Sequence, residues 1–136
     1  MMIFLFVAAT TGMVACKDEA SDAELVIGTT SGGRDMMSYE KTNDVWMYPE
    51  NYEGRQITIK GLYSVGELSG GGKEKHNFVG VYDGCCTWAY LSFVYDGELP
   101  GVNTIVTVKG IVHAKKLDTG SKIVSYAEVE ATEVEF

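Results

Sequence analysis

Residues 55–65 read RQITIKGLYSV, and their apolar side chains recur at every second position. One face of this stretch carries Ile57, Ile59, Gly61, Tyr63 and Val65, while Thr58, Lys60 and Ser64 fall on the other and Leu62 interrupts the alternation. Because successive side chains of a β-strand point to opposite faces, a period of two predicts a strand with one buried face. Gly61 in its interior indicates a bulge or a sharp bend.

Further strands are predicted where apolar and β-branched residues lie between turn-rich segments, at residues 76–82, 88–95, 103–114 and 123–134. Gly110 stands inside one of them, much as Gly61 stands inside the first strand. Internal glycines allow a sheet to curl, and a closed barrel leaves no exposed edge. The predicted fold class is therefore all-β: a small five-stranded OB-like Greek-key barrel, with an open meander or a sandwich as the alternative.

A short helix is predicted ahead of the barrel, at residues 36–47 (MMSYEKTNDVWM), where several side chains recur near helical spacing. Residues 48–54 follow, with a proline near their start and a glycine at their end. This arrangement is typical of a single helical turn. Residues 36–136 are therefore expected to form one domain, the OB-like barrel with its short N-terminal helix.

The beginning of the chain predicts an export signal. Residues 1–15 are uncharged and apolar, but too few to span a bilayer, which takes roughly 20 residues, so they suit a signal peptide. The sequence Met13-Val14-Ala15-Cys16 resembles the lipobox of bacterial lipoproteins, and the resemblance implies that Cys16 becomes the lipidated N-terminus. No Lys or Arg precedes Cys16, which departs from the usual signal peptide. The alternative is a buried apolar helix or strand, with Cys16 as a free thiol.

Residues 16–35 are expected to be the lipidated cysteine and a flexible tether, because small polar residues and glycines dominate them. Only residues 25–27 offer apolar contacts, and the alternative is that they pair as an edge strand. Two or more acyl chains would anchor the protein stably in the cell membrane. We therefore expect a lipid-anchored domain on the extracytoplasmic face.

The composition argues against nucleic acid as a partner and gives no support to catalysis. The formal net charge is -8, with only 11 Lys and Arg residues, whereas nucleic-acid affinity depends on cationic side chains that neutralise phosphates. No Ser-His-Asp order, paired-carboxylate arrangement or cofactor fingerprint is recognisable in the sequence. We expect a protein that is not an enzyme and that binds no nucleic acid.

Three short motifs occur in an order found in a known bacterial group: residues 49–61 (PENYEGRQITIKG), the pair Cys85-Cys86, and residues 106–110 (VTVKG) after Pro100-Gly101. They resemble small bacterial OB-fold lipoproteins with a Cys-Cys motif, which are similar to the C-terminal domain of the partner subunit of a proposed two-component, metal-linked permease. The resemblance implies an OB fold and a partner protein in the envelope, such as a permease. Those relatives continue from Cys-Cys to a glycine and an acidic residue, whereas this chain continues with Thr87-Trp88.

The adjacent cysteines Cys85 and Cys86 carry the candidate chemistry, and three interpretations stay open. As thiolates they would bind a soft metal ion, zinc or copper(I), with His76 or His113 as further ligands. If they lie on a strand, one enters the core and the other is an incidental thiol; a turn at Asp83-Gly84 would instead bring both together. The third interpretation is a redox role, through a disulfide between the two or a mixed disulfide with a partner.

Aromatic residues are numerous for so small a domain, and an OB barrel uses them in its core or as a ligand platform: Trp46, Tyr48, Tyr52, Tyr63, Phe78, Tyr82, Trp88, Tyr90, Phe93 and Tyr95. The leading functional hypothesis is a membrane-tethered, extracytoplasmic binding module without catalysis, with Cys85 and Cys86 as candidate metal ligands. The alternatives are an envelope protein–protein interaction module that needs no small ligand, and a thiol-redox factor.

Overall fold

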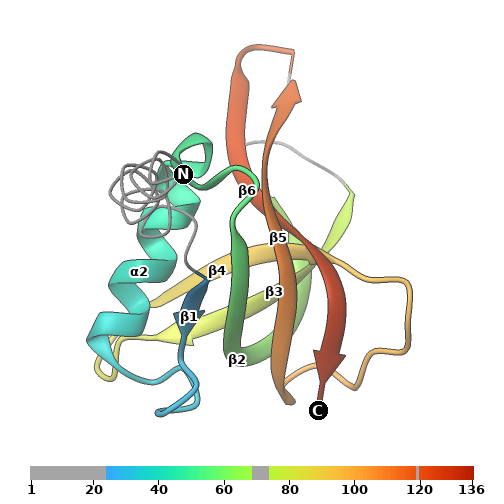
Figure 1. Ribbon diagram of the computed structural model, residues 1–136. Coiled ribbons are helices and arrows are strands. Elements are labelled where there is room, and N and C mark those ends of the chain that lie inside the picture. Colours follow the sequence, from blue (N-terminus) through green and yellow to red (C-terminus); the bar gives the residue numbers. More distant parts are fainter. Residues whose placement is uncertain (1–23, 69–73, 119) are drawn as a thin grey trace, which may run out of the picture.

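The computed structural model describes residues 24–68, 74–118 and 120–136 (Figure 1). The predicted signal peptide, residues 1–15, and the predicted lipidation site Cys16 lie outside these residues. The elements in chain order are β1 (Leu25–Ile27), α2 (Met36–Met47), the 3-10 helix η1 (Pro49–Tyr52), β2 (Gln56–Glu67), β3 (Lys75–Tyr82), β4 (Trp88–Val94), β5 (Ile105–Asp118) and β6 (Ile123–Glu135). No helix in this part of the chain is both long enough and apolar enough to cross a membrane.

Five strands close into a barrel in the order β2, β3, β4, β6, β5, and β5 pairs back onto β2. All neighbours are antiparallel except β4 and β6, which run parallel. The chain leaves β4, runs to β5 beside β2, and returns as β6 between β4 and β5, which is a Greek-key crossing. The predicted all-β, five-stranded OB-like barrel is confirmed, and the open meander and the sandwich are excluded.

Strand β2 closes the barrel because its two halves pair with different partners. Residues from Gln56 to Leu62 pair with β5, and residues from Leu62 to Glu67 pair with β3. Gly61 stands where the strand passes from one partner to the other, and a Cβ placed on it would lie 2.2 Å from the carbonyl oxygen of Gly80 in β3. No side chain fits in that space, so the bend that was expected at Gly61 depends on glycine.

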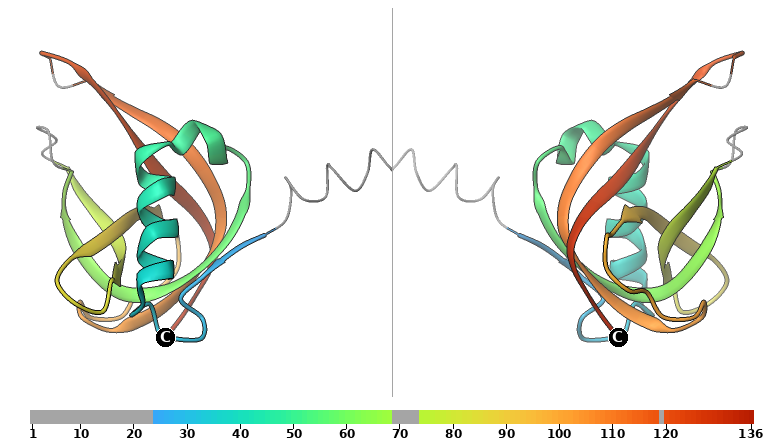
Figure 2. Two further views of the ribbon diagram at one scale, coloured as in Figure 1. Left: turned by 90° about the vertical axis from the view of Figure 1, so that its left-hand side faces the viewer. Right: turned by 90° about the vertical axis from the view of Figure 1, so that its right-hand side faces the viewer.

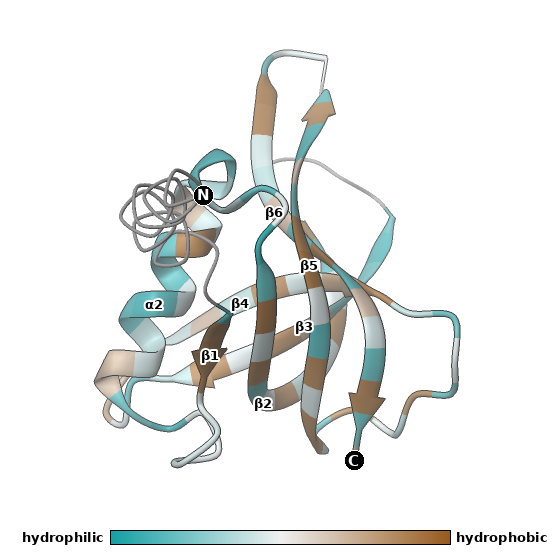
Figure 3. Ribbon diagram, in the orientation of Figure 1, coloured by the Kyte–Doolittle hydropathy of each residue, from teal (hydrophilic) through white to brown (hydrophobic). Residues whose placement is uncertain are grey.

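The core fills the interior of this barrel with alternate side chains from every strand. Tyr63 and Phe93 meet inside it, with their ring centroids 6.0 Å apart. Figure 3 shows that the barrel strands carry most of the apolar residues. Fully buried side chains come from all the barrel strands and from β1 and α2: Ile27, Val45, Ile57, Ile59, Val79, Val81, Leu91, Phe93, Val106, Val108, Val112 and Val129. Burial of each such side chain contributes about 1.5–3 kcal/mol relative to exposure.

Helix α2 begins and ends at the residues that the sequence predicts, and it packs against β3, β4 and β6. Asp35 caps its N-terminus, since the carboxylate accepts a hydrogen bond of 2.8 Å from the backbone N–H of Ser38. Val45 reaches the main core and is fully buried. Seen from the side of α2 (Figure 2, left), the strands lie around the helix, which covers one end of the barrel.

The predicted tether ends earlier than its expected boundary at residue 35. Leu25–Ile27 forms β1, which pairs in parallel with Ile57 to Ile59 of β2, and Arg34 bridges to Tyr82 of β3. The prediction of a flexible tether was wrong for residues 24–35. Strand β3 pairs only with the second half of β2, and β1 pairs with the first half. The alternative, an edge strand at residues 25–27, is the arrangement observed, and residues 16–23 lie outside the described residues.

Strand β5 continues to Asp118, beyond its predicted end at residue 114, whereas β6 begins at Ile123 as predicted. Residues 115–118, which lie outside the predicted strands, therefore pair with residues 123–126 of β6. A bulge also lies in this hairpin: Lys109 pairs with Glu133 and Gly110 with Ala131, which leaves Thr132 without a partner in the ladder. The interior glycine at 110 thus marks an irregularity, as does the one in β2.

The bend in β2 is testable by substitution. We expect Gly61→Ala to lower the free energy of unfolding by about 1–3 kcal/mol, because the added methyl group meets backbone atoms of β3 that have little freedom to move. Urea denaturation measures this change. Gly101→Ala is the matched control, since nothing lies within 4 Å of a Cβ at that position. Equal effects of the two substitutions would contradict the proposed role of Gly61.

Candidate functional site

The outer face of β3 and β4 carries a row of aromatic side chains. Alternation along β4 buries Ala89 and Leu91 in the core and leaves Trp88 and Tyr90 on the opposite side. Phe78 of β3 lies on the same outer face, because it stands one position before the core residue Val79. This row is the floor of the groove described below.

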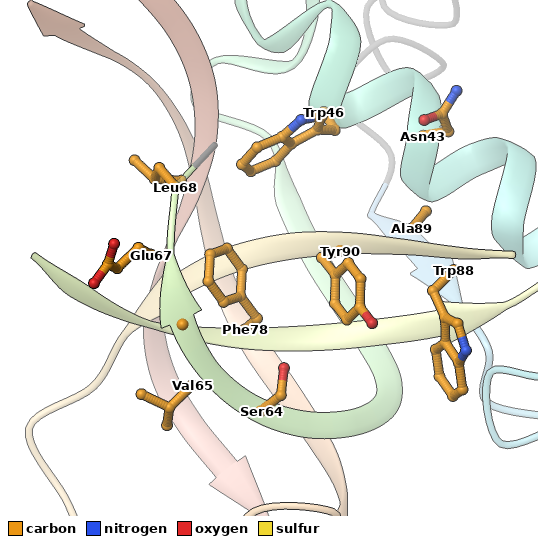
Figure 4. A pocket seen from close by; sticks show the side chains of 11 residues that line it. Asn43, Trp46, Ser64, Val65, Glu67, Leu68, Phe78, Trp88, Ala89 and Tyr90 are labelled. Atoms are coloured by element: carbon orange, nitrogen blue, oxygen red, sulfur yellow. The ribbon is translucent and has the colours of Figure 1, made fainter. Parts of the chain in front are cut away.

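A groove with a volume of about 420 Å³ lies over this floor. Trp46 and Asn43 of α2 form one wall, and the last residues of β2 with Leu68 form the other (Figure 4). The described residues that line this aromatic groove are Asn43, Trp46, Ser64, Val65, Gly66, Glu67, Leu68, Phe78, Trp88, Ala89 and Tyr90. Glu67 is the charged residue among them.

The rings of Trp88 and Tyr90 lie nearly parallel, with an interplanar angle of 16° and centroids 6.2 Å apart. Gly80 faces Tyr90 across the sheet, and a Cβ on it would lie 2.6 Å from Cε1 of Tyr90. The absence of a side chain there lets the Tyr90 ring lie against the backbone of β3. Trp88 is 37% exposed and Tyr90 is 40% exposed, so both present aromatic surface to solvent.

The aromatic row continues beyond these rings at both ends. Phe78 meets Tyr90 edge to face at 6.1 Å, and Trp46 meets Phe78 at 6.5 Å. At the other end, Tyr82 contacts Trp88, with centroids 4.9 Å apart. Edge-to-face and tilted contacts of this kind fix the rings relative to one another. The groove therefore has a floor of mutually supported rings.

The turn between β3 and β4 holds the two cysteines beside the end of this row. Cys85 and Cys86 are joined by a disulfide, and both are exposed. The Asp83 carboxylate accepts hydrogen bonds from the backbone N–H groups of Cys85 at 2.7 Å, Cys86 at 2.7 Å and Thr87 at 3.2 Å. Of these hydrogen bonds, the two from the backbone N–H groups of Cys85 and Cys86 lower the pKa of the Asp83 carboxyl most. The interpretation with one cysteine in the core was wrong, because the turn places both sulfurs outside the barrel.

The predicted metal ligands are not brought together. His76 lies near the start of β3, where Nδ1 is 3.4 Å from Oγ of Ser92, and its ring contacts Phe78 and Tyr126. The cysteines follow Tyr82 at the other end of β3, about 20 Å further along an extended strand. Within residues 24–68, 74–118 and 120–136, no group of three or more His, Cys, Asp and Glu side chains is arranged to hold a metal ion. Binding of zinc or copper(I) by the pair requires thiolates, hence reduction, and stays a prediction.

His113 occupies a separate place on β5, between two carboxylates. Its Nδ1 lies 2.8 Å from Oε2 of Glu53, and its Nε2 lies 2.9 Å from Oε1 of Glu130. The hydrogen bonds to Glu130 and Glu53 raise the pKa of His113. The backbone N–H of Ala114 and the ring of His113 lower the pKa of Glu53. His113 therefore joins η1 to the β5–β6 hairpin rather than serving the cysteine turn.

The sequence contains one local signal of the groove. Trp88 and Tyr90 stand two positions apart on opposite sides of the apolar Ala89, so they share a strand face that points away from Ala89. The contribution of Trp46 and the position of Gly80 beneath Tyr90 have no local signal, because they depend on which elements pack together. The chain matches no protein-family model and no curated protein.

Because Glu53 and Glu130 flank His113, we predict that this histidine contributes to stability in a pH-dependent way. A folded-state pKa above the unfolded value, about 6.5, means that the contribution is complete below the unfolded pKa and is lost as the pH rises through the folded pKa. We expect His113→Gln to lower the melting temperature by a few degrees near pH 5.5, and by less near pH 8.5. Thermal denaturation across this range measures the difference, and a loss that does not depend on pH would contradict the role of the charged ring.

Proposed function

We propose that this protein is a membrane-tethered, extracytoplasmic binding module without catalysis, which receives its ligand in the aromatic groove. The observation that carries the proposal is the position of the groove. In the barrel order, β3 and β4 are the second and third strands, and OB domains bind ligands on the face of those strands and at the adjoining loops. Here that face bears exposed rings instead of the charged side chains that usually cover a sheet.

Exposure of the rings supports a binding role over a purely structural one. Burial of Trp88 and Tyr90 would stabilise the domain, yet both keep more than a third of their surface in solvent. Contiguous exposed apolar surface rimmed by polar residues is a common mark of a binding groove. The polar side chains Asn43, Ser64 and Glu67 supply such a rim.

Tethering is proposed from the N-terminal sequence. The resemblance of Met13-Val14-Ala15-Cys16 to a lipobox supports export and lipidation, and an exported protein is one in which the disulfide of Cys85 and Cys86 is expected to persist. The acidic net charge supports a ligand other than nucleic acid. A partner protein in the envelope is the alternative occupant of the groove.

Groove binding is testable with the double variant Trp88→Ala/Tyr90→Ala. Saturation-transfer NMR of a soluble bacterial envelope extract, mixed with the full-length protein in detergent, is expected to reveal a bound small molecule. We expect the double variant to lose this signal, because it removes the exposed part of the floor. Tyr48→Ala is the control, since Tyr48 is 55% exposed and lies outside the groove. Retention of the signal in the double variant would place the ligand elsewhere.

Lipid anchoring is testable through Cys16. We expect the wild-type protein, expressed in a bacterial host, to partition into the detergent phase of a phase-separating extract, and Cys16→Ser to lose this partitioning. Cys85→Ser/Cys86→Ser is the control and should stay in the detergent phase, because it removes the other two cysteines and leaves the lipobox intact. Unchanged partitioning of Cys16→Ser would contradict lipidation at that residue.

A further inference from the structure

The chemistry of the groove floor restricts what lies on it. Trp88 and Tyr90 present two neighbouring aromatic rings, which lie 16° from parallel with their centroids 6.2 Å apart. Gly80 lets the Tyr90 ring rest against the backbone of β3. Exposed aromatic rings of this kind favour a ligand with flat, weakly polar faces that stack on them. Pyranose rings have this property, since their axial C–H groups lie on one face and their hydroxyl groups project around the edge.

The rim of the groove supplies hydrogen-bonding groups for such an edge. Asn43 of α2 and Ser64 of β2 lie on opposite sides of the aromatic row (Figure 4). The Asn amide both donates and accepts hydrogen bonds, as does the Ser hydroxyl, and the Glu67 carboxylate accepts them. Hydroxyl groups of a saccharide both donate and accept, so they satisfy all three kinds of side chain.

Charge disfavours the anionic ligands that stack on aromatic platforms. None of the described residues lining the groove is Lys or Arg, and Glu67 contributes a negative charge. Nucleotides and phosphorylated or sulfated sugars need cations for their anionic groups, and here they would meet a carboxylate on a protein of net charge -8. The described lining therefore favours a ligand without anionic groups.

Size distinguishes a small ligand from a protein partner. The groove volume of about 420 Å³ lies within the range of roughly 300–1,000 Å³ that is typical of small-molecule sites. A stable protein partner needs about 800 Å² of surface on each side, with a core of closely packed apolar side chains. The polar rim and short aromatic floor suit a few sugar units better than such an interface.

We propose that the aromatic groove binds a short neutral oligosaccharide, with Trp88 and Tyr90 stacking against its sugar rings and Asn43 and Ser64 bonding its hydroxyl groups. This inference rests on the proposed function and names its ligand class. Tyr90 acts through the face of its ring, so its hydroxyl group is dispensable. The ring, by contrast, is required.

Isothermal titration of the full-length protein in detergent tests the proposal with cellotriose, maltotriose and the trimer of N-acetylglucosamine as neutral probes. We expect saturable binding of at least one trimer, weakened about tenfold or more in Trp88→Ala and in Tyr90→Ala, the size of effect expected when one stacking partner is removed. Tyr90→Phe should bind like the wild type, and Tyr48→Ala serves as the exposed aromatic control outside the groove. Unchanged melting temperatures exclude unfolding as the cause.

Three outcomes would overturn the saccharide proposal. The first is binding of a trimer that Trp88→Ala/Tyr90→Ala does not weaken. The second is tighter binding of trigalacturonate or of hexathymidylate, the anionic probes, than of any neutral trimer. The third is no binding of any trimer while a peptide or another molecule of the envelope extract still binds through Trp88 and Tyr90. That third result would leave the proposed binding function intact and change only its ligand class.

Discussion

Strand β2 has to pair with two strands that diverge from each other, and this constraint organises the molecule. The strand runs along β5 for its first half and along β3 for its second, so it must turn sharply between them. Gly61 supplies the turn by allowing β2 to approach the backbone of Gly80. Closure of the barrel then fixes β3 beside β4, and α2 packs against both strands and supplies one wall of the groove. The groove is a consequence of that closure, because each of its walls comes from an element that the bend positions.

The parts of the fold that could be predicted from the sequence are those with a local physical signature. A period of two identifies β2, and Pro49 with the helical spacing before it identifies α2 and η1. Strand β1 has no such signature, because three apolar residues in a polar segment gain stability only from a partner more than thirty positions away, as in the pairing of Leu25 with Ile57. Strand β5 likewise runs past its predicted end because its last residues, several of them polar, pair through their backbones with β6, which the apolar pattern does not indicate.

The candidate site was less predictable, because it depends on side chains that distant elements bring together. The sequence left the positions of Cys85 and Cys86 open between a strand and a turn, and Asp83 decides the matter by accepting three backbone N–H groups. His76 and His113 suit a metal by residue type, but strand pairing places one in an aromatic cluster and the other between carboxylates. Gly80 illustrates the limit most clearly: a glycine inside a strand weakens the sheet locally, and only the position of Tyr90 above it explains its use.

Strand β1 would also limit how far the domain stands from a bilayer if the chain is anchored at Cys16, as we propose. With Leu25 hydrogen-bonded into the sheet, only residues 17–24 separate it from Cys16, and a fully extended chain of that length reaches no more than about 30 Å. A protein anchored at Cys16 would therefore sample a thin layer next to the lipid headgroups and not the wider space beyond. Its ligand would have to be present in that layer, which favours molecules attached to the membrane surface or confined near it over those that diffuse freely.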